Sequence, residues 1–358
     1  MKKMIIALLA AFCLIFSFIA WKLETYQHAK VELDSNADFY LVYPGKIEAF
    51  QLSNDQPKLI HTQKMNSDNY FGSGKNHILD NQSLVFANDQ QKFTNDNLVS
   101  IDFKTGEILR KPSKYATYIS GTDGQHFYTA GPFHALSQFD NTFKLKNQLK
   151  LDDDFFPLPY VYADDTSIYL NGNQITTGQS DSQKNVLYII DKTSFTRSDI
   201  VEYDKNLVTH EGLLAKDTLY LPITSHHALD YKDIETSYDI LTFNTKTRTF
   251  SSITLSQPAP GSIQPLKEDN LLFIEHESDW LSAISFTIYN TQTGQESYHR
   301  LDELNPRPYY IDHVRQLDGN RLLLILAGKA LIYDWQAKKV LSQTILSEDY
   351  VSGVWVND

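Results

Sequence analysis

The sequence is poor in cysteine, glycine, proline and positive charge. Its 358 residues include one cysteine, 15 glycines and 12 prolines. Glycine and proline together fall below the ~12% of an average protein, which excludes collagen-like and Gly/Pro-rich low-complexity chains. Lysine and arginine number 32 against 44 acidic residues, giving a net charge of -12. Because binding to a phosphate backbone requires clustered cations, we expect no nucleic-acid partner.

Charge is missing altogether from one stretch of 18 residues, Met4–Trp21, which follows two lysines. Eighteen helical residues span about 27 Å, close to the thickness of a thin bilayer core. We therefore predict an uncleaved signal-anchor transmembrane helix over residues 1–21 with a cytoplasmic N-terminus. The alternatives are a cleaved signal, although Phe18 stands where a small residue is needed, and lipidation of Cys13, although Phe12 precedes it.

A short linker over residues 22–37 and an extracellular domain over residues 38–358 then follow. The extracellular part has no cysteine, so its core must hold it together without disulfides. The 42% hydrophobic content, with 21 Tyr and 20 Phe, is ample for such a core. Absence of cysteine is common in exported bacterial proteins, so we expect a protein of the bacterial cell surface that is anchored in the cell membrane.

Helical periodicity is nearly absent from this domain, and a strand pattern repeats instead. The pattern is an alternating apolar strand that ends in an Asp- or Asn-based turn, and it is clearest in Leu98–Gly106. Copies lie at residues 186–193, 240–247, 286–294 and 330–334, with weaker ones at 136–140 and 47–51. Their mean spacing of about 47 residues matches a four-stranded propeller blade of ~40–50 residues.

A second pattern has the same spacing as the first. An Asp- or Asn-containing turn and another apolar strand precede most copies of the first pattern. Asp and Asn tolerate left-handed backbone geometry and replace the scarce glycines. The sequence therefore predicts an all-β, seven-bladed β-propeller; if the weak copies are misread, the number is six or eight. The first unit lacks one strand, and Tyr350–Trp355 is a spare strand that would close the ring and cover two edges. The alternative is a frayed C-terminal tail.

The strand-and-turn pattern resembles the quinoprotein-like and YVTN-type seven-bladed β-propeller repeat proteins. The resemblance covers residues 38–358 at the level of repeat shape and implies the architecture. The tryptophan that follows the glycine in quinoprotein repeats is absent after Gly106 and Gly294. We therefore expect no quinone, and we predict no other cofactor.

Two loops contain candidate ligand-binding residues. The first holds His226 and Tyr231, and the second holds His276 and Trp280; His313 is a further candidate ligand-binding residue. An exposed tryptophan beside acidic groups is typical of a binding patch for carbohydrate or protein, although Trp280 could instead pack between blades. His226 and its neighbours could also hold a metal, but adjacent strand residues point to opposite faces, so we predict no metal site.

The sequence contains no local motif of a nucleotide-binding or hydrolytic site. We therefore expect a monomeric, extracellular binding or scaffolding module for a protein, peptide or glycan, with no assigned catalytic residue. One alternative is a propeller-type lyase or hydrolase in which His226, His276 and His313 meet carboxylates at the channel mouth. Another is an accessory subunit that acts through a second membrane protein.

Overall fold

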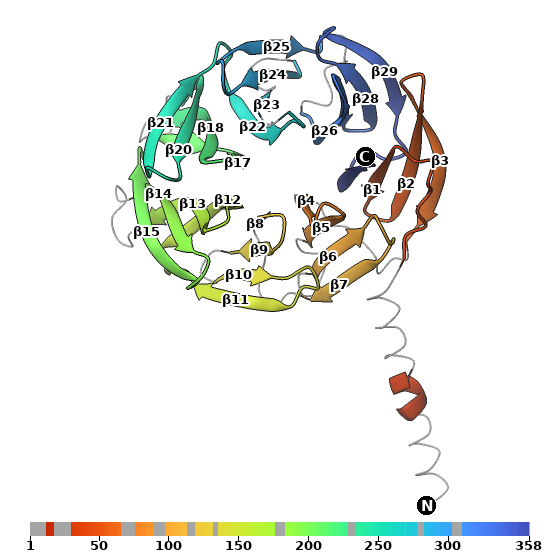
Figure 1. Ribbon diagram of the computed structural model, residues 1–358, viewed down its shortest axis with the longest axis horizontal. Helices are drawn as coiled ribbons and strands as arrows, with labels where there is room; N and C mark the ends of the chain where they lie inside the picture. The colour runs from red at the N-terminus through yellow and green to blue at the C-terminus, as the bar shows by residue number, and fades with distance from the viewer. Residues whose placement is uncertain are drawn as a thin grey trace, which may run out of the picture.

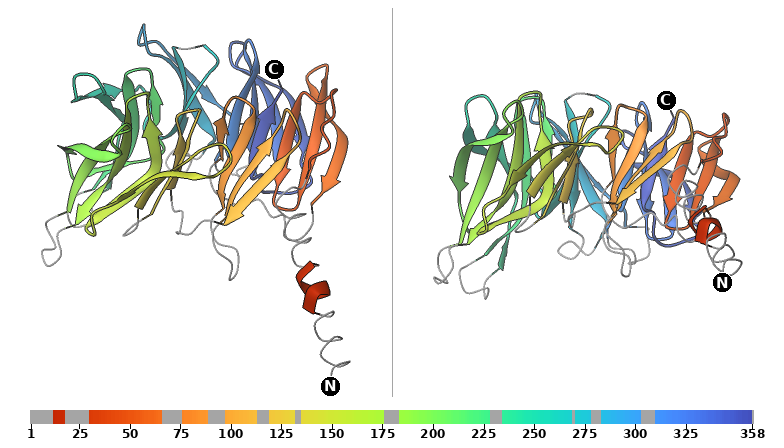
Figure 2. Two further views of the ribbon diagram at one scale, coloured as in Figure 1. Left: turned by 60° about the horizontal axis from the view of Figure 1, so that its bottom comes forward. Right: turned by 90° about the horizontal axis from the view of Figure 1, so that it is seen from below.

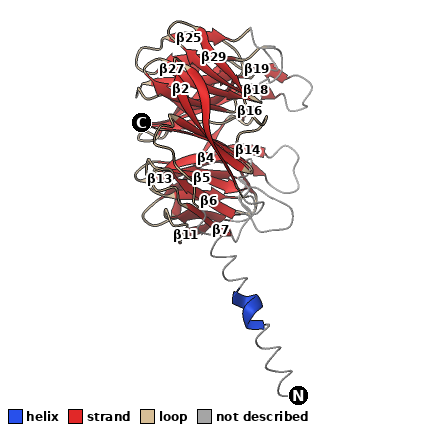
Figure 3. Cartoon of the chain, turned by 90° about the vertical axis from the view of Figure 1, so that its right-hand side faces the viewer, coloured by secondary structure: helices blue, strands red, loops and turns tan. Residues whose placement is uncertain are grey.

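The structure is a computed structural model that describes residues 12–17, 30–65, 76–88, 97–112, 119–131, 135–175, 183–227, 234–268, 270–277, 283–302 and 310–357. Residues 12–17 are helical, and nearly all other regular structure in the described residues is β-strand (Figure 3). The sheets stand side by side around a common axis, which makes an all-β, propeller-like ring (Figure 1). The predicted fold class is confirmed at this level.

The described strands form six sheets. Four have four strands each: β1 (Phe39–Tyr43), β2 (Lys46–Ser53) and β3 (Gln56–Lys64) with β30 (Gly353–Val356); β4 (Asn76–Leu79), β5 (Ser83–Asn88), β6 (Asn97–Asp102) and β7 (Ile108–Pro112); β22 (Pro260–Pro265), β23 (Leu271–His276), β24 (Ser285–Asn290) and β25 (Glu296–Arg300); β26 (His313–Asp318), β27 (Arg321–Leu326), β28 (Lys329–Asp334) and β29 (Lys339–Ile345).

The six-stranded sheet comprises β16 (Leu207–Thr209), β17 (Leu213–Ala215), β18 (Thr218–His227), β19 (Ile234–Thr236), β20 (Asp239–Asn244) and β21 (Thr249–Thr254). The eight-stranded sheet comprises β8 (Ile119–Thr122), β9 (Phe127–Ala130), β10 (Ala135–Phe139), β11 (Leu145–Lys150), β12 (Phe155–Ala163), β13 (Ser167–Ile175), β14 (Gln183–Asp191) and β15 (Thr196–Tyr203). One parallel pair, Tyr160 with Ser120, joins its two four-stranded halves.

The hydrophobic core lies between neighbouring sheets, which pack face to face around the ring (Figure 2). Strand β1 has a continuously apolar sequence because it is buried on both faces. Tyr40 and Val42 pack towards β5 and β6, whereas Phe39 and Leu41 pack on the other side towards β27 and β28. Because both faces are buried, the usual alternation with polar residues disappears. The outer strand β3 keeps mostly exposed or half-buried side chains.

The turns use Asp and Asn as predicted. Asp102 accepts hydrogen bonds from the backbone N–H groups of Lys104 (2.7 Å) and Thr105 (2.9 Å). Asn244 and Asn290 accept the same pair of bonds in their own turns. A side-chain oxygen that accepts from the backbone two and three residues ahead fixes the turn without glycine at every position.

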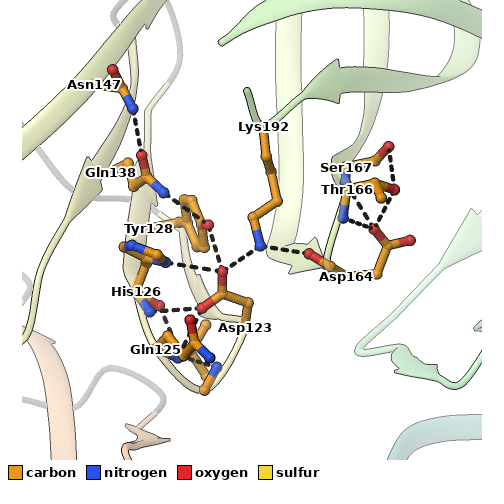
Figure 4. A network of polar contacts seen from close by, with 12 residues as sticks. Asp123, Gln125, His126, Tyr128, Gln138, Asn147, Asp164, Thr166, Ser167 and Lys192 are labelled. Carbon is orange, nitrogen blue, oxygen red and sulfur yellow. Dashed lines mark hydrogen bonds and ion pairs between the residues drawn. The ribbon is translucent and has the colours of Figure 1, made fainter. Parts of the chain in front are cut away.

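One turn also connects two halves of the eight-stranded sheet (Figure 4). The Asp123 carboxylate accepts hydrogen bonds from Lys192 Nζ (2.6 Å) and from the Tyr128 hydroxyl (2.8 Å). Lys192 also donates to the backbone oxygen of Asp164 (2.6 Å). Burial alone would raise the pKa of Asp123, but hydrogen bonds from Lys192 and the backbone outweigh it and hold the pKa well below its usual range.

The C-terminal strand β30 pairs with β1 in antiparallel register, from Phe39 opposite Val356 to Val42 opposite Gly353. Figure 1 shows the C-terminus on the inner side of β1. Asn357 donates from its side chain to the backbone oxygen of Ala37 (2.7 Å). The two ends of the described ring are thus hydrogen-bonded to each other.

The predicted anchor falls mostly on residues 1–11 and 18–29, which lie outside the described residues. Within the described part of the chain, no helix has the length and apolarity required to cross a membrane. The anchor, the linker boundary and the extracellular location therefore stay predictions.

Candidate functional site: the central cavity

A cavity of about 650 Å³ lies at the centre of the ring. Its wall is built from the strands closest to the axis, namely β4, β8, β12, β17, β22, β26 and β30. These strands come from every sheet of the described ring, and Asn76 and Val356, which are 280 positions apart in sequence, both line the cavity. A volume of ~300–1,000 Å³ is typical of sites for small molecules.

Some inner strands of neighbouring units approach one another closely in this wall. A side-chain carbon added at Gly121 in β8 would lie 1.8 Å from the backbone oxygen of Val161 in β12. A second parallel bridge joins Glu211 to Ser262. Glycine at position 121 is therefore required by the close approach of two strands, which explains one of the few glycines inside a strand.

The charged side chains in the cavity wall are all basic or potentially basic: His77, Lys267 and Arg315. No carboxylate is among the described residues that line it, although the whole chain carries 44 acidic residues. Tyr160, Tyr162 and Trp355 supply aromatic surface. The cavity therefore combines positive charge with apolar and aromatic walls.

Arg315 occupies the wall in β26 and contacts three neutral acceptors. It donates to the side-chain oxygens of Asn76 in β4 (3.0 Å) and Gln264 in β22 (3.5 Å), and to the backbone oxygen of Val314 (2.9 Å). Asn76 is itself held by a hydrogen bond from its amide to the backbone oxygen of Ser352 (3.0 Å). Desolvation lowers the pKa of Arg315 to about 10, so the group remains protonated at neutral pH.

Carboxylates gather behind the wall rather than on it. Glu275 accepts hydrogen bonds from the backbone of Ile311 (2.8 Å) and from the Ser262 hydroxyl (3.0 Å). Desolvation, together with the negative charges of Glu211 and Asp312, outweighs these hydrogen bonds and raises the pKa of Glu275 to about 7. This group can exchange a proton near neutral pH. Among the described residues, no group of His, Cys, Asp and Glu side chains has the arrangement of a metal site.

His77 lies on the wall and forms a hydrogen bond with the Ser120 hydroxyl across two sheets (2.9 Å between Nε2 and Oγ). Ser120 is buried at 5% exposure and belongs to the strand pair that joins β8 to β12. The contact thus ties β4 to β8 beside the cavity.

Two of the sequence-predicted residues, His276 and His313, have described side chains, and neither side chain lines the cavity. His276 is 1% exposed, and its ring contacts the Pro258 backbone oxygen and the Thr287 hydroxyl, both at 2.8 Å. Burial lowers the pKa of His276. His313 donates from Nε2 to the backbone oxygen of Val351 (2.8 Å). Neither histidine is part of the cavity wall.

The other candidates lie beyond what the structure describes. His226 belongs to β18 by its backbone, but its side chain is outside the described residues, as are Tyr231 and Trp280. Their predicted binding role stays a prediction. Sequence reasoning missed Arg315 and Asn76, because each is one of several polar residues in a short strand. Asn76 is followed by His77 in β4, and β26 also contains His313 and Gln316, so no local pattern sets Arg315 or Asn76 apart.

No protein-family model matches the chain, and no curated protein sequence does. Several solved structures are similar. A candidate 6-phosphogluconolactonase from Bacteroides fragilis has a TM-score of 0.58 at 10% identity, over 92% of this chain and 100% of that one. The computationally designed Ika8 protein has a TM-score of 0.57 at 11% identity, over 93% and 91%. Dihydro-heme d1 dehydrogenase NirN has a TM-score of 0.51 at 14% identity, over 91% and 76%.

At these identities the similarity shows the fold and nothing finer. The predicted resemblance to β-propeller repeat proteins is confirmed at the level of architecture. Because 870 chains of solved structures match, the fold by itself selects no function. The residues of the cavity therefore have to indicate what the protein binds.

Proposed function

We propose that this chain is a ligand-binding module of the cell surface, built as a seven-bladed ring and held in the membrane by residues 4–21. The seven copies of the strand pattern support the blade number, as does the division of the eight-stranded sheet into two four-stranded halves. The charge-free run of 18 residues after two lysines supports the anchor. The protein acts as a monomer whose partner is a protein, peptide or glycan.

The central cavity is the main support for a binding role. A ring whose inner strands all border one cavity of about 650 Å³ offers a concave surface for a ligand or for a protruding group of a larger partner. The proposal of a lyase or hydrolase has less support, because His276 and His313 are engaged elsewhere and the described carboxylates lie behind the wall.

The location is tested with a single introduced cysteine, since the chain has only Cys13. Lys104→Cys in a Cys13→Ser background places one thiol on an exposed turn. Intact cells should react with a membrane-impermeant maleimide as fully as lysed cells do. Labelling that appears only after lysis would contradict an extracellular domain.

The binding role is tested with two substitutions at equally exposed isoleucines. Ile78 lines the cavity and Ile175 does not, and both are 39% exposed. The full chain is screened against glycan and peptide arrays as wild type, as Ile78→Trp and as Ile175→Trp. We expect Ile78→Trp to abolish binding by filling the cavity and Ile175→Trp to retain it. Equal binding by both variants would place the site elsewhere and would refute the proposal.

A further inference from the structure

The cavity wall has a charge opposite to that of the protein. The chain carries a net charge of -12, yet the described residues of the wall include His77, Lys267 and Arg315 and no carboxylate. Cationic side chains on a concave surface that carries no carboxylate of its own favour a negatively charged ligand.

Arg315 is distinguished from most other arginines of the chain by its partners. Arg197, Arg248, Arg300 and Arg321 each pair with an aspartate. Arg315 forms no ion pair with any described carboxylate, and its Nε has no hydrogen-bond partner among the described residues. Arg315 is half-buried and its Nε is inaccessible to water. A partly desolvated guanidinium without a counter-ion costs stability, unless a ligand supplies the negative charge.

The position of the guanidinium follows from its two side-chain partners. Asn76 lies in β4 and Gln264 lies in β22, which belong to different sheets on either side of Arg315. One side chain can reach both only where the inner strands converge on the cavity. The hydrogen bond from Asn76 to the Ser352 backbone fixes the amide oxygen that orients Arg315. The positive group is thus held in place before any ligand arrives, which lowers the entropy cost of binding.

We propose that Arg315 binds a carboxylate or phosphate oxyanion of the ligand in the central cavity, with an apolar part of that ligand against the aromatic wall beside Trp355. The guanidinium presents paired N–H donors that suit a carboxylate or a phosphate. Trp355 is fixed by stacking on Phe103, with ring centroids 4.9 Å apart. This inference rests on the proposed role of the cavity as the binding site and assigns the chemical class of its ligand.

The test uses three probes that share a phenyl ring. Benzoate carries a carboxylate, phenyl phosphate carries a phosphate, and benzamide is the neutral isostere of benzoate. The full chain is reconstituted in nanodiscs of zwitterionic phosphatidylcholine, which has no net charge, and the affinity for each probe is measured by calorimetry. We expect at least one anion to bind at least tenfold more tightly than benzamide, with an affinity that falls in high salt. The preferred anion distinguishes a carboxylate ligand from a phosphate ligand.

Substitutions of Arg315 test whether the affinity for the anion depends on its guanidinium. Arg315→Gln should weaken the preferred anion at least tenfold, and Arg315→Lys should weaken it less because the charge is kept. Arg248→Gln, which removes an exposed arginine paired with Asp199, is the matched control and should leave the affinity unchanged. Thermal melting of each variant establishes that it is folded.

The outcomes separate this inference from the proposed function. If Ile78→Trp abolishes anion binding and Arg315→Gln does not weaken it, the cavity binds ligands but the oxyanion site is refuted. If neither variant matters, both proposals fail. Equal affinity for benzoate, phenyl phosphate and benzamide, or no binding of either anion at millimolar concentration, also overturns the oxyanion site.

Discussion

Removal of the C-terminal strand should destabilise the ring as a whole. Val351 and Val354 are both 0% exposed, and Val354 packs with Phe39 and Leu323 between two sheets. Burial of a valine contributes about 1.5–3 kcal/mol. Backbone hydrogen bonds from Ser352 to Val42 (2.7 Å) and from Asn357 to Asp38 (2.9 Å) are lost as well, at about 1 kcal/mol each.

The total is about 5–8 kcal/mol, against the roughly 5–15 kcal/mol that separates most folded domains from their unfolded state. We expect a chain truncated before Tyr350 to be unfolded, or to associate through the newly exposed edge of β1. Urea denaturation followed by tryptophan fluorescence measures the stability, and size-exclusion chromatography measures the association.

A graded control is Val354→Ala, which removes two methyl groups and keeps the strand. It should lower the free energy of unfolding by about 2 kcal/mol and leave the protein monomeric. A truncated chain that remains a monomer with an unchanged urea midpoint would refute the closure of the ring by β30.

Three further predictions concern the turns, the inner strands and the carboxylates. Asp123→Asn should lower the free energy of unfolding by about 2–4 kcal/mol at pH 7. The pKa of Asp123 is depressed in the folded state, so its carboxylate stabilises the fold above the unfolded pKa, and this stabilisation is lost as pH falls through the folded pKa. The urea midpoints of wild type and Asp123→Asn should therefore differ less in acid than at pH 7. Gly121→Ala should destabilise by more than 2 kcal/mol, since the added carbon would lie 1.8 Å from the oxygen of Val161, whereas Gly45→Ala meets nothing within 4 Å and should be neutral. The pKa of Glu275 is raised to about 7, so the stability that its protonated form contributes is lost as pH rises through that value. Glu275→Gln should therefore be more stable than wild type by about 2 kcal/mol at pH 8, and not at pH 4. A urea midpoint gap that is independent of pH would contradict the last prediction.

The repeating strands were accessible to sequence reasoning because their signal is local. The alternating run at Leu98–Gly106 and the turn on Asp102 depend on residues within ten positions of one another. The unpaired first unit and the spare strand after Tyr350 followed from counting strands per repeat. These features need no knowledge of how the sheets pack.

The residues that line the cavity could not be predicted from local sequence. Its wall brings Asn76 beside Arg315, and that contact depends on the curvature of the whole ring. A histidine in an apolar strand also has two physical outcomes, and His276 takes the buried one because both ring nitrogens find partners within the core. Local sequence cannot decide between a satisfied core histidine and an exposed ligand-binding one.

Hydrogen–deuterium exchange of the full chain, with and without the tightest-binding compound from the screens, tests whether ligand binding occurs at the inner strands of the ring. We predict that the ligand slows exchange in β4, β22, β26 and β30 and leaves the outer strands β3, β7 and β29 unchanged. Protection confined to the outer strands, with none in the strands of the cavity wall, would contradict ligand binding in the central cavity.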